Sequence, residues 1–156
     1  MRSTGWSSES TPAHVILAGD ERAISYLDPE LPERVRPLVE HVARIDMRAT
    51  VEDVREEIAP MLWALEEADG MAAADRAVAG WRAGDLGVVG VDATMAALEI
   101  GQVDELIVDE SVEADAELRA ELIRQATATD ARVEIVRDHP ELRHHEGVAA
   151  TLRYRL

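Results

Sequence analysis

The sequence lacks cysteine, lysine, asparagine and phenylalanine. The absence of cysteine excludes disulfides, thiolate metal ligands and a cysteine nucleophile, and it fits the reducing cytoplasm in which we expect the protein to be located. Three tryptophans without any phenylalanine leave no aromatic stripe on which nucleic-acid bases would stack. No apolar run reaches the roughly 18 residues that a membrane-spanning helix needs, so no transmembrane segment is predicted.

Positive charge is also scarce. The chain has 16 basic residues, all of them arginine, against 32 acidic residues, and its net charge is −16. This charge opposes encounter with the phosphate backbone of a nucleic acid, so RNA contact is disfavoured and would depend on a local group of arginines. The candidates for such contact lie near the carboxyl terminus and are Arg132, Arg137, Arg143, Arg153 and Arg155.

Acidic residues are densest between positions 104 and 121. A run of like charges usually forms a solvated face, and this is the simplest interpretation. The alternative is a docking surface for a basic partner. Its candidate residues are Glu113, Asp115, Glu117 and Glu121.

The length and composition of the chain are typical of a globular protein of about one domain. Of 156 residues, 47% are hydrophobic and 31% are charged, and this length is sufficient to bury a core without disulfides. Residues 1–13 lack the apolar segment of a secretory signal and are predicted to form a flexible leader.

The first part of the chain predicts a small β-α segment. The apolar run at 15–19 is typical of a buried strand, and residues 20–27 favour a short helix. Residues 31–42 predict a second helical stretch, interrupted at Pro37, and residues 45–47 predict a short edge strand.

Two further helices are predicted before position 82. Thr50 and Asp53 resemble a capping box at the start of an amphipathic helix that runs to about Leu65. Pro60 is expected to kink or break this helix, because proline donates no backbone hydrogen bond. The second helix is predicted at 72–81.

From Leu86 onward, short apolar runs alternate with helical patterns. This alternation is typical of an α/β sandwich in which helices cover a sheet. The last run alternates in a way that predicts one covered face and one face that carries arginines. The predicted strands lie at 86–89, 106–108, 132–136 and 148–156, and the predicted helices at 91–100, where Gly101 ends the helix, and at 112–129, with one helical turn in the loop 138–147.

Three histidines lie between His139 and His145, next to Glu146. His144 and His145 are adjacent, so they diverge by about 100° in a helix and point to opposite faces in a strand. No HExxH motif is present, and we expect loop histidines that bind no metal. The glycine-rich stretch at 84–90 lacks the lysine of a phosphate loop and predicts a turn. No spacing identifies a catalytic group, so we expect a protein that is not an enzyme and needs no cofactor.

Two stretches together resemble a known family. Residues 86–111 resemble the entry to the third domain of the archaeal and eukaryotic class-1 peptide chain release factors and of Pelota, and residues 146–156 resemble the end of that domain. We expect a bacterial or archaeal relative of this family. The matching residues are Gly90, Ala97, Leu98, Glu99, Gly101, Val103, Glu105, Leu106, Ile107 and Val108 in the first stretch, and Gly147, Ala150, Leu152, Arg153 and Tyr154 in the second.

The resemblance implies a fold and a domain organisation. Residues 14–48 are similar to the end of the family's middle domain, and residues 49–156 to its third domain. The implied fold is an α/β/α sandwich on a mixed sheet of about four strands, similar to the kink-turn-binding ribosomal protein fold and preceded by a short β-α remnant. RNA-binding members of that fold carry asparagine, glutamate and lysine where this chain has Asp92, Ala93 and Ala96, so these RNA contacts are expected to be lost.

The resemblance also implies a role in translation. The family's peptidyl-tRNA hydrolysis depends on a GGQ tripeptide that this sequence lacks, so release activity is not expected. The leading hypothesis is a non-catalytic interaction module that docks a translational GTPase or the ribosome in termination, rescue or hibernation. A stand-alone binder of structured RNA is the alternative, and a small metal-dependent hydrolase is a weaker one. The sequence has no counterpart of the family's codon-reading domain, so the chain could be a fragment of a longer protein or a naturally reduced relative.

Overall fold

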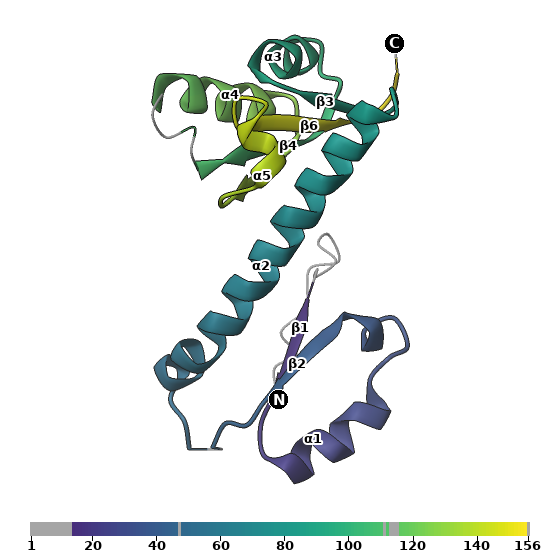
Figure 1. The fold of residues 1–156 in the computed structure, drawn as a ribbon. Coiled ribbons are helices and arrows are strands. Elements are labelled where there is room, and N and C mark those ends of the chain that lie inside the picture. The colour runs from purple at the N-terminus through teal and green to yellow at the C-terminus, as the bar shows by residue number, and fades with distance from the viewer. Residues whose placement is uncertain (1–13, 47, 111, 113–115, 156) are drawn as a thin grey trace. The chain divides into compact units, whose positions relative to one another are not determined.

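The computed structural model describes residues 14–46, 48–110, 112 and 116–155 (Figure 1). The leader predicted at 1–13 lies outside these residues. The chain divides into two compact units, Met1–Leu65 and Glu66–Leu156. The division falls within one long helix, α2 (Val51–Arg82), which contributes its first half to one unit and its second half to the other.

The described part of the first unit begins with a short β-α segment, as predicted. Its elements ahead of α2 are β1 (Val15–Ala18), α1 (Glu21–Leu27), the 3-10 turns η1 (Asp28–Glu30) and η2 (Arg36–Leu38), and β2 (Val39–Ala43). Asp20 is the N-cap of α1, since its Oδ1 accepts hydrogen bonds from Arg22 N and Ala23 N at 2.9 Å each. The strands β1 and β2 pair in parallel, with Val15 opposite Val39.

The helical stretch predicted at 31–42 is wrong. Pro37 lies in the single 3-10 turn η2, and the backbone becomes extended at Val39, with φ −82° and ψ 103°. From Val39 onward the chain pairs with β1, and this pairing outweighs the weak helical pattern ahead of it. The edge strand predicted at 45–47 is also wrong for Ile45 and Asp46, which lie in no strand, whereas Met47 is not among the described residues.

A single helix of 32 residues, α2, replaces the two predicted helices. The capping box is confirmed, because Asp53 N donates to Thr50 Oγ1 at 3.2 Å and Thr50 N donates to Asp53 Oδ2 at 2.8 Å. The break predicted at Pro60 is wrong, since α2 continues through it. Proline removes one backbone hydrogen bond, and the alanine, methionine and leucine beside Pro60 favour the helix strongly enough to sustain it. Within the described ranges, no helix is long and apolar enough to cross a membrane.

The second unit is an α/β/α sandwich on a mixed four-stranded sheet, which confirms the predicted fold class. Its elements after α2 are β3 (Gly87–Val89), α3 (Val91–Glu99), β4 (Val103–Asp109), α4 (Ala116–Ala128), β5 (Arg132–Val136), α5 (Pro140–Arg143) and β6 (Val148–Leu152). The strand order is β3-β6-β4-β5. The strands β4 and β5 are parallel, whereas β6 is antiparallel to both of its neighbours.

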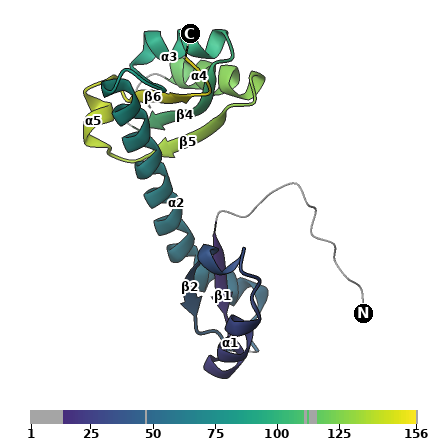
Figure 2. The same cartoon turned by 90° about the vertical axis from the view of Figure 1, so that its right-hand side faces the viewer.

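Helices cover both faces of this sheet (Figure 2). The helices α3 and α4 cover one face, where Leu98, Leu106 and Leu122 are fully buried. The second half of α2 covers the other face together with α5, and there Ile107 and Leu142 are fully buried beside alanines of α2. Strand β4 therefore sends apolar side chains to both sides, which explains the continuous apolar run in its sequence.

The final strand predicted at 148–156 is confirmed at 148–152, but the prediction that one of its faces is uncovered is wrong. Strand β6 ends at Leu152, and Ala149, on the face expected to be open, is fully buried in the same cluster as the alanines of α2. Alanine gives little hydrophobic signal, so a face covered through small side chains resembles an uncovered one in the sequence. The small side chains bring α2 close to the sheet.

The closest approach of α2 to the sheet is made through glycine. A Cβ atom on Gly87 would lie 2.2 Å from Ala77 O and 2.4 Å from Trp81 N, so only glycine fits at this position of β3. Gly80 faces the same contact from the helix, where a Cβ atom would lie 3.1 Å from Gly87 N. Two glycines thus fix the distance between α2 and β3.

Candidate functional site

His139 is a structural residue at the start of α5. It is 3% exposed and forms the N-cap of this helix. Its Nδ1 accepts a hydrogen bond from Leu142 N at 3.3 Å, so the ring proton lies on Nε2, which is 3.2 Å from Asp75 Oδ1 of α2. Its backbone N–H donates to the buried carboxylate of Asp109 at 2.8 Å. His139 therefore joins α5 to β4 and α2.

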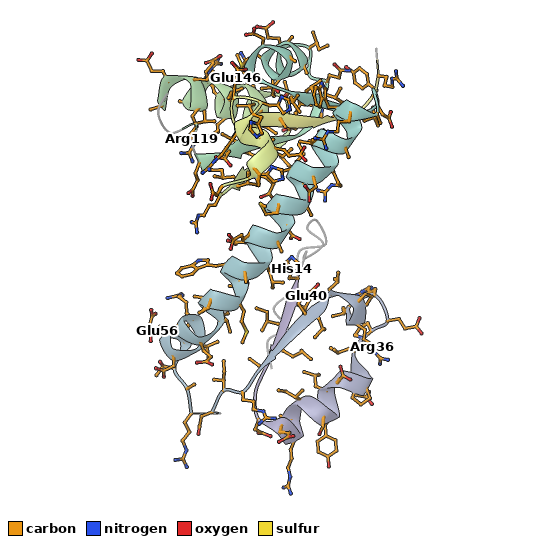
Figure 3. The ribbon with its side chains drawn as sticks, viewed as in Figure 1. His14, Arg36, Glu40, Glu56, Arg119 and Glu146 are labelled. Atoms are coloured by element: carbon orange, nitrogen blue, oxygen red, sulfur yellow. The ribbon has the colours of Figure 1, made fainter. Side chains whose placement is uncertain are left out.

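The other members of the histidine cluster have different neighbours. His144 is exposed, and the ring of His145 meets the indole of Trp81 edge-on, with ring centroids 4.7 Å apart. Glu146 points toward the start of α3 (Figure 3), where its Oε2 accepts a hydrogen bond from Val91 N at 3.0 Å. No group of three or more histidine, cysteine, aspartate or glutamate side chains in the described part of the chain is placed to hold a metal ion.

The N-terminus of α3 is occupied by an internal anion. Backbone N–H groups at a helix N-terminus attract anions such as phosphate. Here the Glu146 carboxylate lies at that position and is bonded to Val91 N. Gly90, with φ 86°, begins the helix, and a Cβ atom there would lie 3.3 Å from Glu146 Oε2. The glycine-rich stretch at 84–90 thus comprises a turn at Gly84, with φ 62°, followed by β3, and the predicted turn is confirmed.

Most of the arginines proposed for RNA contact are bound to carboxylates. The pairs are Arg132 with Asp104 at 2.9 Å, Arg137 with Glu110 at 3.0 Å, and Arg143 with Asp138. The hydrogen bond that Arg132 donates to the Asp104 side chain, followed by the charge of Glu105, raises the pKa of Arg132. Arg155 is exposed. A paired guanidinium contributes less to phosphate binding than a free one, so these pairs weigh against RNA contact.

Arg153 has a structural role at the end of α4. Its Nη2 donates to Thr129 O at 3.1 Å and to Asp130 O at 2.7 Å, and both carbonyls follow directly after α4. A cation near the C-terminus of a helix satisfies its last carbonyl groups and stabilises its dipole. Arg153 therefore connects the residues after β6 to α4, which gives a physical reason for its place in the matched motif.

Two of the matched glycines lie at turns where the backbone has a positive φ. Gly101 has φ 68° and its N–H donates to Leu98 O at 3.0 Å, so it ends α3 as predicted. Gly147 has φ 72° and its N–H donates to Leu142 O at 2.7 Å, which closes the turn ahead of β6. Ala97 and Leu98 are buried, Leu152 is half-buried, and Glu99 and Tyr154 are exposed.

The candidate acidic docking surface lies partly within the described residues. Glu113 and Asp115 lie outside the described residues. Glu117 is exposed in the first turn of α4. Glu121 pairs with Arg124, and the hydrogen bond from Arg124, together with that from Gln125, holds the pKa of Glu121 below its usual range. Glu117 thus remains a candidate for docking, whereas Glu121 is partly neutralised.

A charged network between α2, β4 and β5 was not identified from the sequence. Glu105 is 4% exposed and lies 3.2 Å from Arg76 Nη2 of α2 and 3.5 Å from Arg132 Nη1 of β5. Glu134 lies on β5 nearby, and burial, followed by the charges of Glu105 and Asp69, raises its pKa. One signal was available, namely Glu105 directly ahead of the apolar run 106–108, because glutamate is rarely buried without a partner.

Comparison with solved structures gives matches across both units. Ribosome-bound archaeal Pelota matches with a TM-score of 0.67 and 19% identity, over 90% of this chain and 43% of that chain. Dom34 from S. cerevisiae matches with a TM-score of 0.60 and 14% identity, over 92% of this chain and 47% of that chain. The C-terminal domain of a peptide chain release factor from Methanosarcina mazei matches with a TM-score of 0.54 and 16% identity, over 70% of this chain and 98% of that chain. The chain has the C-terminal fold of Pelota and the release factors.

No protein-family profile and no curated protein matches the sequence, so the evidence for this Pelota-like fold is the structural similarity. The chain spans less than half of the length of archaeal Pelota and of Dom34, and it covers almost all of the M. mazei release-factor domain. The sequence motifs at 86–108 and 147–154 lie in the sandwich, at the glycine turns, buried strands and arginine cap described above. The predicted resemblance to the C-terminal region of this family is confirmed at the level of the fold.

Proposed function

We propose that the protein is a non-catalytic interaction module that acts in translation by docking to the ribosome or to a translational GTPase. The observation that carries this proposal is the fold, since the chain covers 98% of a release factor's C-terminal domain. Two structural neighbours support the choice of partners. One is a Pelota in a ribosome-bound assembly with ABCE1, and the other is Dom34, which interacts with Hbs1.

The absence of the GGQ tripeptide supports a role without catalysis. The side chains that first suggest chemistry are used to hold the fold together: His139 caps α5 and Glu146 occupies the N-terminus of α3. A net charge of −16 and the paired arginines favour a protein partner over RNA.

Co-sedimentation with ribosomes tests the proposal. The full chain is expected in the ribosomal pellet at low salt, and the pelleted fraction should fall as salt screens the contact between an acidic module and basic ribosomal proteins. Glu117→Gln is expected to lower the pelleted fraction if α4 forms the contact. Glu99→Gln removes a charge that is also exposed, at the end of α3, and is the matched control.

Two outcomes would contradict the proposal. The chain could remain in the supernatant with ribosomes and also fail to bind a purified translational GTPase. Alternatively, the pelleted fraction could disappear after brief treatment with a ribonuclease that spares the ribosomal proteins, which would assign the contact to RNA. Equal effects of Glu117→Gln and Glu99→Gln would place the contact away from the acidic face of α4.

A further inference from the structure

Strand β5 forms an open edge of the sheet. It is the last strand in the order β3-β6-β4-β5, and its pairing in the described residues is with β4 alone. An edge strand presents backbone N–H and C=O groups to a further strand, and proteins use such edges to bind extended peptides. The character of the two faces beside β5 decides which peptide would fit.

Apolar side chains lie beside this edge on the face covered by α4. Ile135 is 42% exposed and points to the same face as Val133, which packs against the core beneath α4. A hollow on α4 is lined by Ala116, Arg119, Ala120 and Ile123. The right-handed crossover from β4 through α4 to β5 turns this flank of α4 toward β5. Apart from Arg119, the surface on this side of the edge is therefore apolar, and it is only partly covered.

Carboxylates lie beside the edge on the opposite face. Glu134 alternates with Ile135 and points toward α2, where a Cβ atom on Gly70 would lie 3.9 Å from Glu134 Oε2. The charged groups that act on Glu134 are Glu105, Asp69 and Glu66, against Arg132. Burial is the largest cause that raises the pKa of Glu134, followed by these carboxylates. This side of the edge carries more negative than positive charge.

We propose that the outer edge of β5 binds an extended segment of a partner protein in which apolar and basic side chains alternate. Successive side chains of a strand point to opposite faces, so such a segment places its apolar residues against Ile135 and Ile123 and its basic residues near Glu134. This inference rests on the proposed docking function and names its surface and the chemistry of its partner. A second copy of this chain is a poor fit, because it carries the same net charge of −16 and would bring a second Glu134 to the edge.

A labelled peptide of about ten residues with alternating valine and arginine tests the inference by fluorescence anisotropy against the full chain. A peptide of the same composition with its arginines grouped at one end controls for general attraction to an acidic protein. The variants Ile135→Ser and Glu134→Gln are each expected to weaken binding of the alternating peptide by roughly threefold to tenfold. Ile100→Ser and Glu99→Gln make the same changes at an exposed isoleucine and an exposed glutamate elsewhere, and they are expected to leave binding unchanged.

Hydrogen exchange adds a measurement that charge alone would not change. Amide hydrogens of residues 132–136 are expected to exchange more slowly when the alternating peptide is bound, because the edge groups become hydrogen-bonded. Equal binding of the grouped peptide, unchanged exchange in β5, or equal effects of the test and control variants would each overturn the inference. A dimer of the free chain that is lost in Ile135→Ser would assign the edge to a second copy and would overturn it too.

The same variants separate this inference from the proposed function. Ribosome co-sedimentation that persists unchanged in Ile135→Ser and Glu134→Gln, without peptide binding, would overturn the edge site and leave the docking function standing. Specific peptide binding in a chain that does not pellet with ribosomes would support the edge site and contradict the proposed function.

Discussion

The substitution His139→Ala is expected to destabilise the chain by about 2 kcal/mol. Loss of an N-cap side chain costs about 1 kcal/mol. The lost bond is the one from Leu142 N, and because Leu142 is fully buried, water replaces the acceptor poorly, which raises the cost to about 2 kcal/mol. The contact with Asp75 adds little, because the Asp75 side chain is 78% exposed. For a chain of this size, the unfolding midpoint should fall by about 4–8 °C.

Thermal unfolding followed by circular dichroism checks this value. His139→Asn should recover part of the loss, since the asparagine oxygen also accepts the capping hydrogen bond. His144→Ala changes an exposed histidine and should alter stability by less than about 0.5 kcal/mol. An unchanged midpoint for His139→Ala would refute the capping role. A midpoint that zinc raises in the parent chain but not in His139→Ala would instead indicate a metal site.

Three further predictions concern packing, capping and pH. Gly87→Ala should lower the free energy of unfolding, measured by chemical denaturation, by about 3 kcal/mol. Gly84 has φ 62° and open space around it, so Gly84→Ala should cost only about 1 kcal/mol. Equal losses would contradict the close contact between Gly87 and α2. Arg153→Ala should cost about 1 kcal/mol and speed hydrogen exchange at the end of α4, whereas the same change at Arg155 should do neither. The pKa of Glu134 is raised from its ordinary 4.5, so the folded state binds the proton more tightly than the unfolded state and loses stability as the pH rises above that value. The Glu134→Gln variant should therefore be more stable than the parent at pH 7 and lose this advantage near pH 4. An equal difference in stability at both pH values would contradict the raised pKa.

The sandwich was predictable because its signals are local. Alternating apolar runs and helical patterns after Leu86 indicated the strands and helices, and Gly101 indicated the end of α3. The continuity of α2 was not predictable from the same rules, since Pro60 normally ends a helix. Strand β2 was missed because it exists through pairing with β1, a contact between distant residues that leaves no local pattern.

The side-chain contacts of the site depend on strand register and were harder to predict from the sequence. The adjacency of His144 and His145 predicted that their side chains diverge, but the sequence could not show that His139 is buried. Two of its hydrogen-bond partners are Asp109 and Asp75, which lie 30 and 64 positions away. Likewise, the pairing of Arg132 with Asp104 requires the parallel register of β4 and β5, which no spacing in the sequence specifies.

The most direct test of the account measures ribosome binding and peptidyl-tRNA hydrolysis in the same reaction. Ribosomes that carry a labelled peptidyl-tRNA are incubated with the full chain and pelleted, and both the pelleted chain and the released peptide are quantified. The chain is expected to pellet with the ribosomes while the peptidyl-tRNA stays intact. Release of the peptide by the chain would contradict the non-catalytic role, and absence of the chain from the pellet would contradict docking to the ribosome.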